Sequence, residues 1–125
     1  MTVSLDALTV SELLAPARKT ASENGAAFDL HDYDGRFIVA FSTSAGGGTT
    51  PTLDVKIQDS TDGSTGWADV SGAAFTQVTD AADSTQSLTL DTDAVKVYIR
   101  VVTTITGTSP TFDMAVVGVG LKQNF

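Results

Sequence analysis

The sequence predicts an all-β protein: a single-domain antiparallel β-sandwich or jelly roll of about eight strands with an extended N-terminal arm. Two observations predict the sandwich. Apolar and polar residues alternate in several short segments, which is the period of strands that bury one face. Gly, Pro or Asp residues separate most of these segments at intervals of about ten residues, a spacing typical of sandwiches and jelly rolls rather than of alternating helices and parallel strands.

The chain of 125 residues is long enough for one domain with its own hydrophobic core. It has no cysteine, which excludes disulfides and zinc–thiolate sites. No apolar run reaches the ~18 residues of a membrane-spanning helix, and the N-terminus lacks the basic start and apolar core of a signal peptide. We therefore expect a soluble protein with no membrane partner that is not exported by a signal peptide.

Acidic residues outnumber basic ones by fifteen to seven, which gives a net charge of −8. This charge opposes binding to a phosphate backbone, and the only adjacent basic residues are Arg18 and Lys19. We therefore expect no nucleic-acid partner. Thirteen of the fifteen acids are Asp, a residue that favours turns because its side chain bonds nearby backbone groups. The acidity thus fits the soluble surface of a loop-rich β fold.

The first part of the chain, residues 1–24, is predicted to be an N-terminal arm, and residues 25–125 the β-sandwich domain. The leucines of the arm have only loose helical spacing, and Pro16 would end or kink a helix at this point. The alternative is that the segment is an ordinary first strand of the sandwich, beginning near Val3. An arm would have to lie against the domain or a neighbouring chain to be ordered.

Eight strands are expected within the domain. They are 27–31, 36–43, 52–60, 66–70, 73–78, 86–90, 95–102 and 112–121. The last two are expected to form a long pair joined by a tight turn at Gly107–Pro110, because Pro cannot donate to a ladder and Gly tolerates a positive φ. The run Val116–Val119 is so continuously apolar that both of its faces are expected to be covered. Trp67 is expected in the core.

The loops carry no ligand motif. The triple glycine within Ala45–Pro51 is not followed by the Lys-Ser/Thr pair of a phosphate-binding loop, so we interpret it as a linker. The loop Asp59–Ser64 lacks the alternating ligands and closing Glu of a calcium-binding EF-hand, so we interpret it as a solvated turn. The sequence gives no reason to expect a metal or another cofactor.

No catalytic constellation is found either. His31 is the only histidine, and its neighbour Asp32 is expected to point to the opposite face because adjacent residues of a strand do so. There is no Gly-x-Ser-x-Gly motif and no cysteine nucleophile. A glycosidase needs a matched pair of carboxylates, and the sequence singles out no such pair among its many Asp residues. We therefore expect no enzymatic activity and name no catalytic residue.

Several strand and turn segments together resemble a known group of proteins. The segments are Gly25–Leu30, Thr50–Gln58, Ser60–Ser64 before Trp67, Ala74–Val78 and Gly107–Phe112. They resemble small proteins encoded in tailed-bacteriophage and prophage structural gene clusters, and the resemblance extends from about Arg18 to Lys122. It implies a virion component, namely a capsid decoration or cement protein with a β-sandwich or jelly-roll fold. These segments contain no catalytic signature, so no functional residue carries over.

A decoration protein of this kind would bind the major capsid protein on the outside of the head, as a homotrimer, after synthesis in the cytoplasm of the bacterial host. The residues expected to contact the capsid all lie in the predicted arm. They are Leu5, Leu8, Leu13, Leu14, Arg18 and Lys19. The basic pair would face an acidic capsid surface; alternatively, its two charges are simply solvated.

Two other functions share this fold. A minor tail or head–tail component would come from the same gene clusters and differ from a decoration protein in its copy number per virion. A carbohydrate-binding module would instead use exposed aromatic side chains as stacking platforms for sugars. The candidate aromatics are Tyr33, Trp67 and Tyr98.

Overall fold

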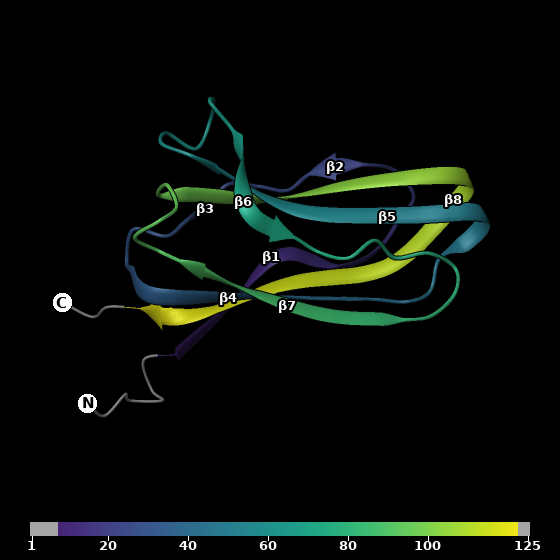
Figure 1. Cartoon of the computed structure of the whole chain (residues 1–125), viewed down its shortest axis with the longest axis horizontal. Helices are drawn as coiled ribbons and strands as arrows, with labels where there is room; N and C mark the ends of the chain where they lie inside the picture. The colour runs from purple at the N-terminus through teal and green to yellow at the C-terminus, as the bar shows by residue number, and fades with distance from the viewer. Residues whose placement is uncertain (1–7, 123–125) are drawn as a thin grey trace.

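The computed structural model describes residues 8–122, and these residues form an all-β antiparallel sandwich as the sequence predicts (Figure 1). The strands are β1 (Leu8–Lys19), β2 (Glu23–Asn24), β3 (Phe28–Asp29), β4 (Tyr33–Thr43), β5 (Gly47–Ser60), β6 (Ala68–Ala74), β7 (Ser84–Asp91) and β8 (Tyr98–Lys122). Within residues 8–122, no helix has the length and apolar character needed to cross a membrane.

The strands form two layers that share β8. Layer A contains β1, the C-terminal half of β8, β4 and β7, in that order across the layer. Layer B contains the short strands β2 and β3, then the N-terminal half of β8, β5 and β6. All of these pairings are antiparallel. Because β8 runs through both layers, the ladders form one sheet folded over on itself (Figure 1).

The predicted tight turn at Gly107–Pro110 is instead a corner within β8. The strand bends from layer B into layer A here, and β5 bends beside it while the two stay paired, for example at Thr49 and Thr108 (Figure 1). Gly107 has a φ of 119°, and a Cβ there would lie 2.9 Å from the Cα of Pro51. The expectation of two separate strands was wrong because the glycine bends a ladder that continues through it.

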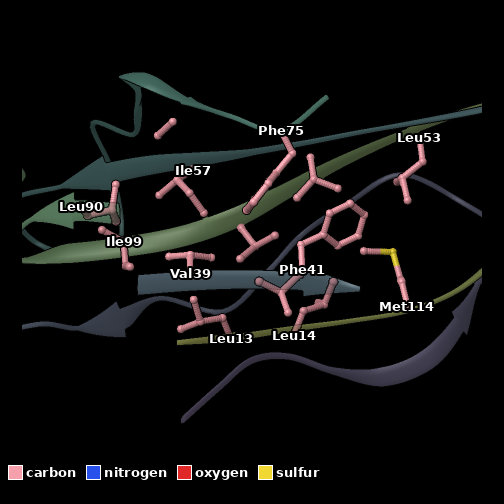
Figure 2. Close-up of a cluster of buried hydrophobic side chains, with 14 of the residues drawn as sticks. Leu13, Leu14, Val39, Phe41, Leu53, Ile57, Phe75, Leu90, Ile99 and Met114 are labelled. Atoms are coloured by element: carbon pink, nitrogen blue, oxygen red, sulfur yellow. The ribbon is translucent and has the colours of Figure 1, made fainter. Parts of the chain in front are cut away.

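The core lies between the inner faces of the two layers (Figure 2). Alternate residues of each strand point into it, as the pleat requires. The largest fully buried side chains include Phe37 and Phe41 of layer A and Leu53, Ile57 and Ile99 of layer B. The sequence-based prediction of an inward Leu53, Val55 and Ile57 is confirmed, since each is at most 2% exposed.

Residues 8–19 are not an arm but the edge strand β1 of layer A. They pair with β8 from Leu8 opposite Leu121 to Lys19 opposite Phe112. A register shift between Glu12 and Leu14 lets both Leu13 and Leu14 enter the core, where they are 9% and 7% exposed. The bulge breaks the period of two, which is why the segment did not read as a strand. The alternative, a first strand, is correct for this stretch, and its expected start near Val3 lies outside the described residues.

Two predicted strands around Trp67 are also arranged differently. Strand β6 spans Ala68–Ala74, and the chain then stays beside β5, where Val78 and Leu53 exchange two backbone hydrogen bonds of 2.8 and 2.9 Å. Trp67 itself precedes β6 and is half-buried rather than in the core. Its ring is covered by the guanidinium of Arg100, 4.4 Å from the ring centroid. A cation can cover an indole face as an apolar side chain would.

The loop between β5 and β6 is held by the carboxylate of Asp62. Its Oδ1 accepts the backbone N–H groups of Ser64 and Thr65 at 2.9 and 2.8 Å, and its Oδ2 accepts the Thr65 hydroxyl at 2.8 Å. These bonds, that from the Thr65 N–H above all, hold the pKa of Asp62 well below its usual range. The carboxylate thus serves the turn itself, which agrees with a solvated turn rather than a calcium loop.

The bulge in β1 generates a stability prediction. Leu14→Ala removes a core side chain and should lower the free energy of unfolding by about 2–5 kcal/mol. Val10→Ala in the same strand is the matched control, because Val10 is 68% exposed; its effect should stay within about 0.5 kcal/mol. Urea unfolding of both variants measures the difference. Equal, small effects would mean that β1 does not contribute to the core.

The Asp62 turn generates a pH prediction. A carboxyl group whose pKa is lowered by folding stabilises the protein above its ordinary pKa of about 4, and this contribution is lost as the pH falls through its lower folded-state pKa. Asp62→Ala should therefore lower the melting temperature at neutral pH, and the gap to the unmodified protein should narrow steadily in acid. The control is Asp80→Ala, since Asp80 is exposed and its side chain makes no hydrogen bond among residues 8–122. A gap that stays constant with pH would contradict the proposed role of the charge.

Candidate interaction surface

The outer face of layer A is apolar over most of three strands, with the exposed Glu12 opposite Val117 on the edge strand β1. We call this surface the apolar face; it consists of Leu8, Val10, Ile38, Ala40, Ala115, Val117, Val119 and Leu121. The alternation of the strands explains it: Val39 and Phe41 point into the core, so Ile38 and Ala40 point outward. Nothing else among residues 8–122 forms a further layer over this face (Figure 1).

The strand register brings these side chains into rows. Val10, Val119 and Ile38 lie opposite one another on β1, β8 and β4, and Leu8 lies opposite Leu121 at the end of the face. Neighbouring strands are about 4.8 Å apart, so side chains in one row touch. Val10, Leu8 and Ile38 are 68%, 44% and 42% exposed, and they are the large hydrophobic residues that the described structure leaves most open. A contiguous apolar surface of this kind is typical of an interaction site.

The other end of the face carries an ion pair and a depression. Arg18 donates from Nε and Nη2 to the two carboxylate oxygens of Asp113 at 2.8 and 3.1 Å. These hydrogen bonds lower the pKa of Asp113 and raise that of Arg18. Beside the pair is an open depression of about 440 Å³, lined by Pro16, Ala17, Arg18, Ser42, Asp113, Met114 and Ala115.

The residues predicted to contact a partner lie in different parts of the structure. Leu8 lies on the apolar face, whereas Leu13 and Leu14 are in the core and cannot reach a partner without unfolding β1. Arg18 is paired with Asp113, and the Nζ of Lys19 lies 2.7 Å from Glu23 Oε1. Both basic residues are therefore already neutralised within the chain. Leu5 lies outside the described residues.

Sequence reasoning missed most of the apolar face. The signal was present, because branched apolar residues occupy both faces of the strands around Ile38 and Val117. For the run Val116–Val119, the pattern leads to the expectation that both faces are covered. In the structure one face is covered by layer B, and the outer face remains open within residues 8–122.

The single histidine forms an exposed pair with its neighbour. His31 Nδ1 lies 3.2 Å from Asp32 Oδ1, and the two side chains are 77% and 52% exposed. The prediction that they point apart was wrong, because they lie in a turn between β3 and β4 and not in a strand. Within residues 8–122, neither side chain bonds a Ser or Thr hydroxyl, and no group of three or more His, Cys, Asp or Glu is placed to hold a metal ion.

The three candidate aromatic platforms do not form a common surface. Trp67 is covered by Arg100. The ring of Tyr33 packs edge-on against Phe37, with 5.2 Å between the ring centroids. Tyr98 lies beneath the loop after β5, so closely that a Cβ on Gly63 would be 3.0 Å from its ring. Each ring is thus engaged by the chain itself.

The chain was compared with known proteins. No protein-family model matches it, and no curated protein matches its sequence. Similar solved structures include the SPBc2 prophage-derived protein YomS, with a TM-score of 0.51 and 10% identity over 95% of this chain and 98% of that one. A chain of infectious bursal disease virus, Gt strain, gives a TM-score of 0.54 and 12% identity over 92% of this chain and 33% of that one. A CBM4 structure gives 0.51 and 20% identity over 93% and 73%. At these identities the likeness shows the fold alone.

Proposed function

We propose that the protein is a non-enzymatic structural component of a phage virion, a decoration or cement protein that binds the major capsid protein on the outside of the head. The observation that carries the proposal is the apolar face, an open hydrophobic surface on a stiff sandwich. The resemblance to proteins of phage structural gene clusters suggests the phage virion as the place where this surface is used. The fold shared with a prophage-derived protein and with a virus chain agrees with it.

A preformed β layer suits such a contact because little has to become ordered on binding. The backbone of β1, β4 and β8 is fixed by ladders on both sides of β8, so the entropy cost of binding falls mainly on side chains. Valine and isoleucine have few rotamers to lose. Fully burying one such side chain contributes about 1.5–3 kcal/mol relative to leaving it exposed. The apolar face offers several, which would stabilise contacts between neighbouring capsid subunits.

The charge distribution changes the expected mode of contact. Arg18 and Lys19 form ion pairs with Asp113 and Glu23, so we do not assign them the attraction to an acidic capsid surface. Hydrophobic burial carries the contact instead. The net charge of −8 favours the exterior of the head, because packaged DNA in the interior would repel an acidic protein. Several copies bound to one lattice would also gain affinity by avidity.

The alternatives fit the site less well or differ only in location. A sugar ring could stack on Trp67 only after displacing Arg100, whose Nε and Nη2 also donate to Gln58 Oε1 at 3.0 and 2.7 Å. This disfavours a carbohydrate-binding module. A tail or head–tail component would use the same apolar face, and it is distinguished by where the protein lies in the particle and how many copies are present.

Particles made with and without the protein test the proposal directly. We expect density on the outside of the head at a copy number comparable to that of the major capsid protein, imaged by electron cryomicroscopy. Heads that lack the protein should burst at a lower temperature, or sooner after magnesium is removed. Density confined to the tail, or heads of unchanged stability, would contradict the decoration role.

The apolar face predicts which substitutions weaken binding of the protein to the phage head. Val10→Lys combined with Ile38→Lys should lower occupancy at least about tenfold, because two charges would have to be buried in the interface. Both residues are exposed, so the variant should remain folded. The matched control is Thr104→Lys combined with Thr106→Lys, which adds the same charge at exposed positions in the part of β8 that pairs with β5. Quantitative gel analysis of purified heads measures occupancy, and equal binding of both variants would contradict the assignment of the face.

A further inference from the structure

Strand β7 is an edge strand without the features that keep sheet edges from pairing. Its register with β4 is unbroken over eight residue pairs, and it contains no Pro, Lys or Arg. The other edges of the sandwich are all protected. Strand β1 has Pro16 and two register shifts, β6 has a register shift and a Gly72 with φ 75°, and β2 and β3 are two residues each. Proteins normally block long regular edges because such edges pair with other strands.

The hydrogen-bond pattern shows which residues of β7 face the open edge. The N–H of Thr92 donates to the carbonyl of Gly35 at 2.9 Å, one step beyond the Arg36–Asp91 pair. This makes Arg36–Asp91 a non-hydrogen-bonded pair, and such pairs alternate with hydrogen-bonded ones along an antiparallel ladder. The residues whose backbone groups point away from β4 are therefore Thr85, Ser87, Thr89 and Asp91. Among residues 8–122, none of these N–H groups has a backbone partner beyond β4, and of the C=O groups only that of Asp91 does, because it accepts the N–H groups of Ala94 and Val95 at 2.9 and 3.2 Å.

A side chain of β7 that points toward layer B is already hydrogen-bonded within the chain. The backbone groups along the outer edge of β7 are what a partner strand could bind. The side-chain amide of Gln86 accepts from the N–H of Thr76 at 2.8 Å and donates to the Thr76 carbonyl at 2.9 Å. It thereby bridges layer A to the segment that follows β6. Thr85, Ser87 and Thr89 remain exposed. A partner strand would therefore add to the sheet without rearranging the core.

We propose that β7 pairs with β7 of a second copy of this chain, antiparallel across a two-fold axis at Leu88. In this register Ser87 lies opposite Thr89 of the second copy, and these two pairs form the centre of the new ladder. Thr85 lies opposite Asp91 of the second copy, whose N–H is open while its C=O is already bonded within its own chain. Thr–Ser neighbours across strands are favourable, and no two like charges lie opposite within the strand. A two-fold axis at Ser87 would place Asp83 opposite Asp91 of the strand, whereas the axis at Leu88 leaves the nearest like-charged pair, Asp83 and Asp93, beyond both ends of β7.

The pairing makes one continuous layer from the two copies of layer A. It leaves the apolar face uncovered, so the proposal stands independently of the capsid role and is tested on the purified protein alone. The net charge of −8 on each copy opposes association, and added salt screens this repulsion. The dimer should therefore become tighter as the salt concentration rises. The two-fold dimer also differs from the trimer that the family resemblance implies.

Sedimentation velocity of the full chain tests the proposal with two variants of opposite effect. Ser87→Lys with Thr89→Lys places lysines opposite each other across the axis and should raise the dimer dissociation constant at least about tenfold. Ser87→Lys with Thr89→Glu places each lysine opposite a glutamate of the second copy and should retain the dimer. Both side chains are exposed in each case, and an unchanged melting temperature at low protein concentration checks that the fold is intact.

Each outcome of this experiment either supports or overturns the proposed dimer. A dimer that the two-lysine variant weakens and the lysine–glutamate variant keeps supports the register. A protein that remains monomeric up to about 1 mM, the range of very weak complexes, overturns the proposal. So does a trimer, or a dimer that both variants leave equally strong. None of these results bears on whether the apolar face binds a capsid, because that contact uses other strands.

Discussion

The backbone hydrogen bonding of β8 is the constraint on which the rest of the structure depends. This strand pairs with β1, β2, β3, β4 and β5, so it is central in both layers. Its inward residues, among them Ile99, Val101 and Val116, meet in the core from the two sides of the corner. Because one strand fixes both layers, their separation and the direction of their outer faces are fixed together. The apolar face and the open edge of β7 both follow from this arrangement.

The fold class could be predicted from the sequence because local alternation determines it. Leu53, Val55 and Ile57 point inward as expected, and turns separate most of the strands. Two features could not be read locally. The bulge that buries both Leu13 and Leu14 depends on the register with β8, about a hundred residues away in the sequence. The corner at Gly107 has the composition of a turn, and only the continued pairing with β5 shows that the strand does not end there.

The candidate surface was harder to predict than the fold. A strand with two apolar faces, such as that around Val117, has the same sequence whether its outer face is covered by its own chain or left open for a partner. The partner of Arg18, Asp113, is 95 residues away and cannot be recognised from the sequence alone, whereas Glu23 lies only four residues from Lys19. Of the predicted contacts that fall within residues 8–122, Leu8 alone lies on the apolar face. The sequence shows which side chains are apolar or charged, but it does not show which face of the sandwich they occupy.

The pairing of β1 with β8 also bears on how the chain folds as it leaves the ribosome. The first described strand finds its neighbour only after more than a hundred further residues have been synthesised, since Leu8 lies opposite Leu121. Until then neither layer has its central strand, and an emerging chain would expose alternating apolar segments with free edges. Contacts of such long sequence separation slow folding and prolong exposure to aggregation. The long-range pairing of β1 with β8 thus extends the period in which nascent chains can pair with one another.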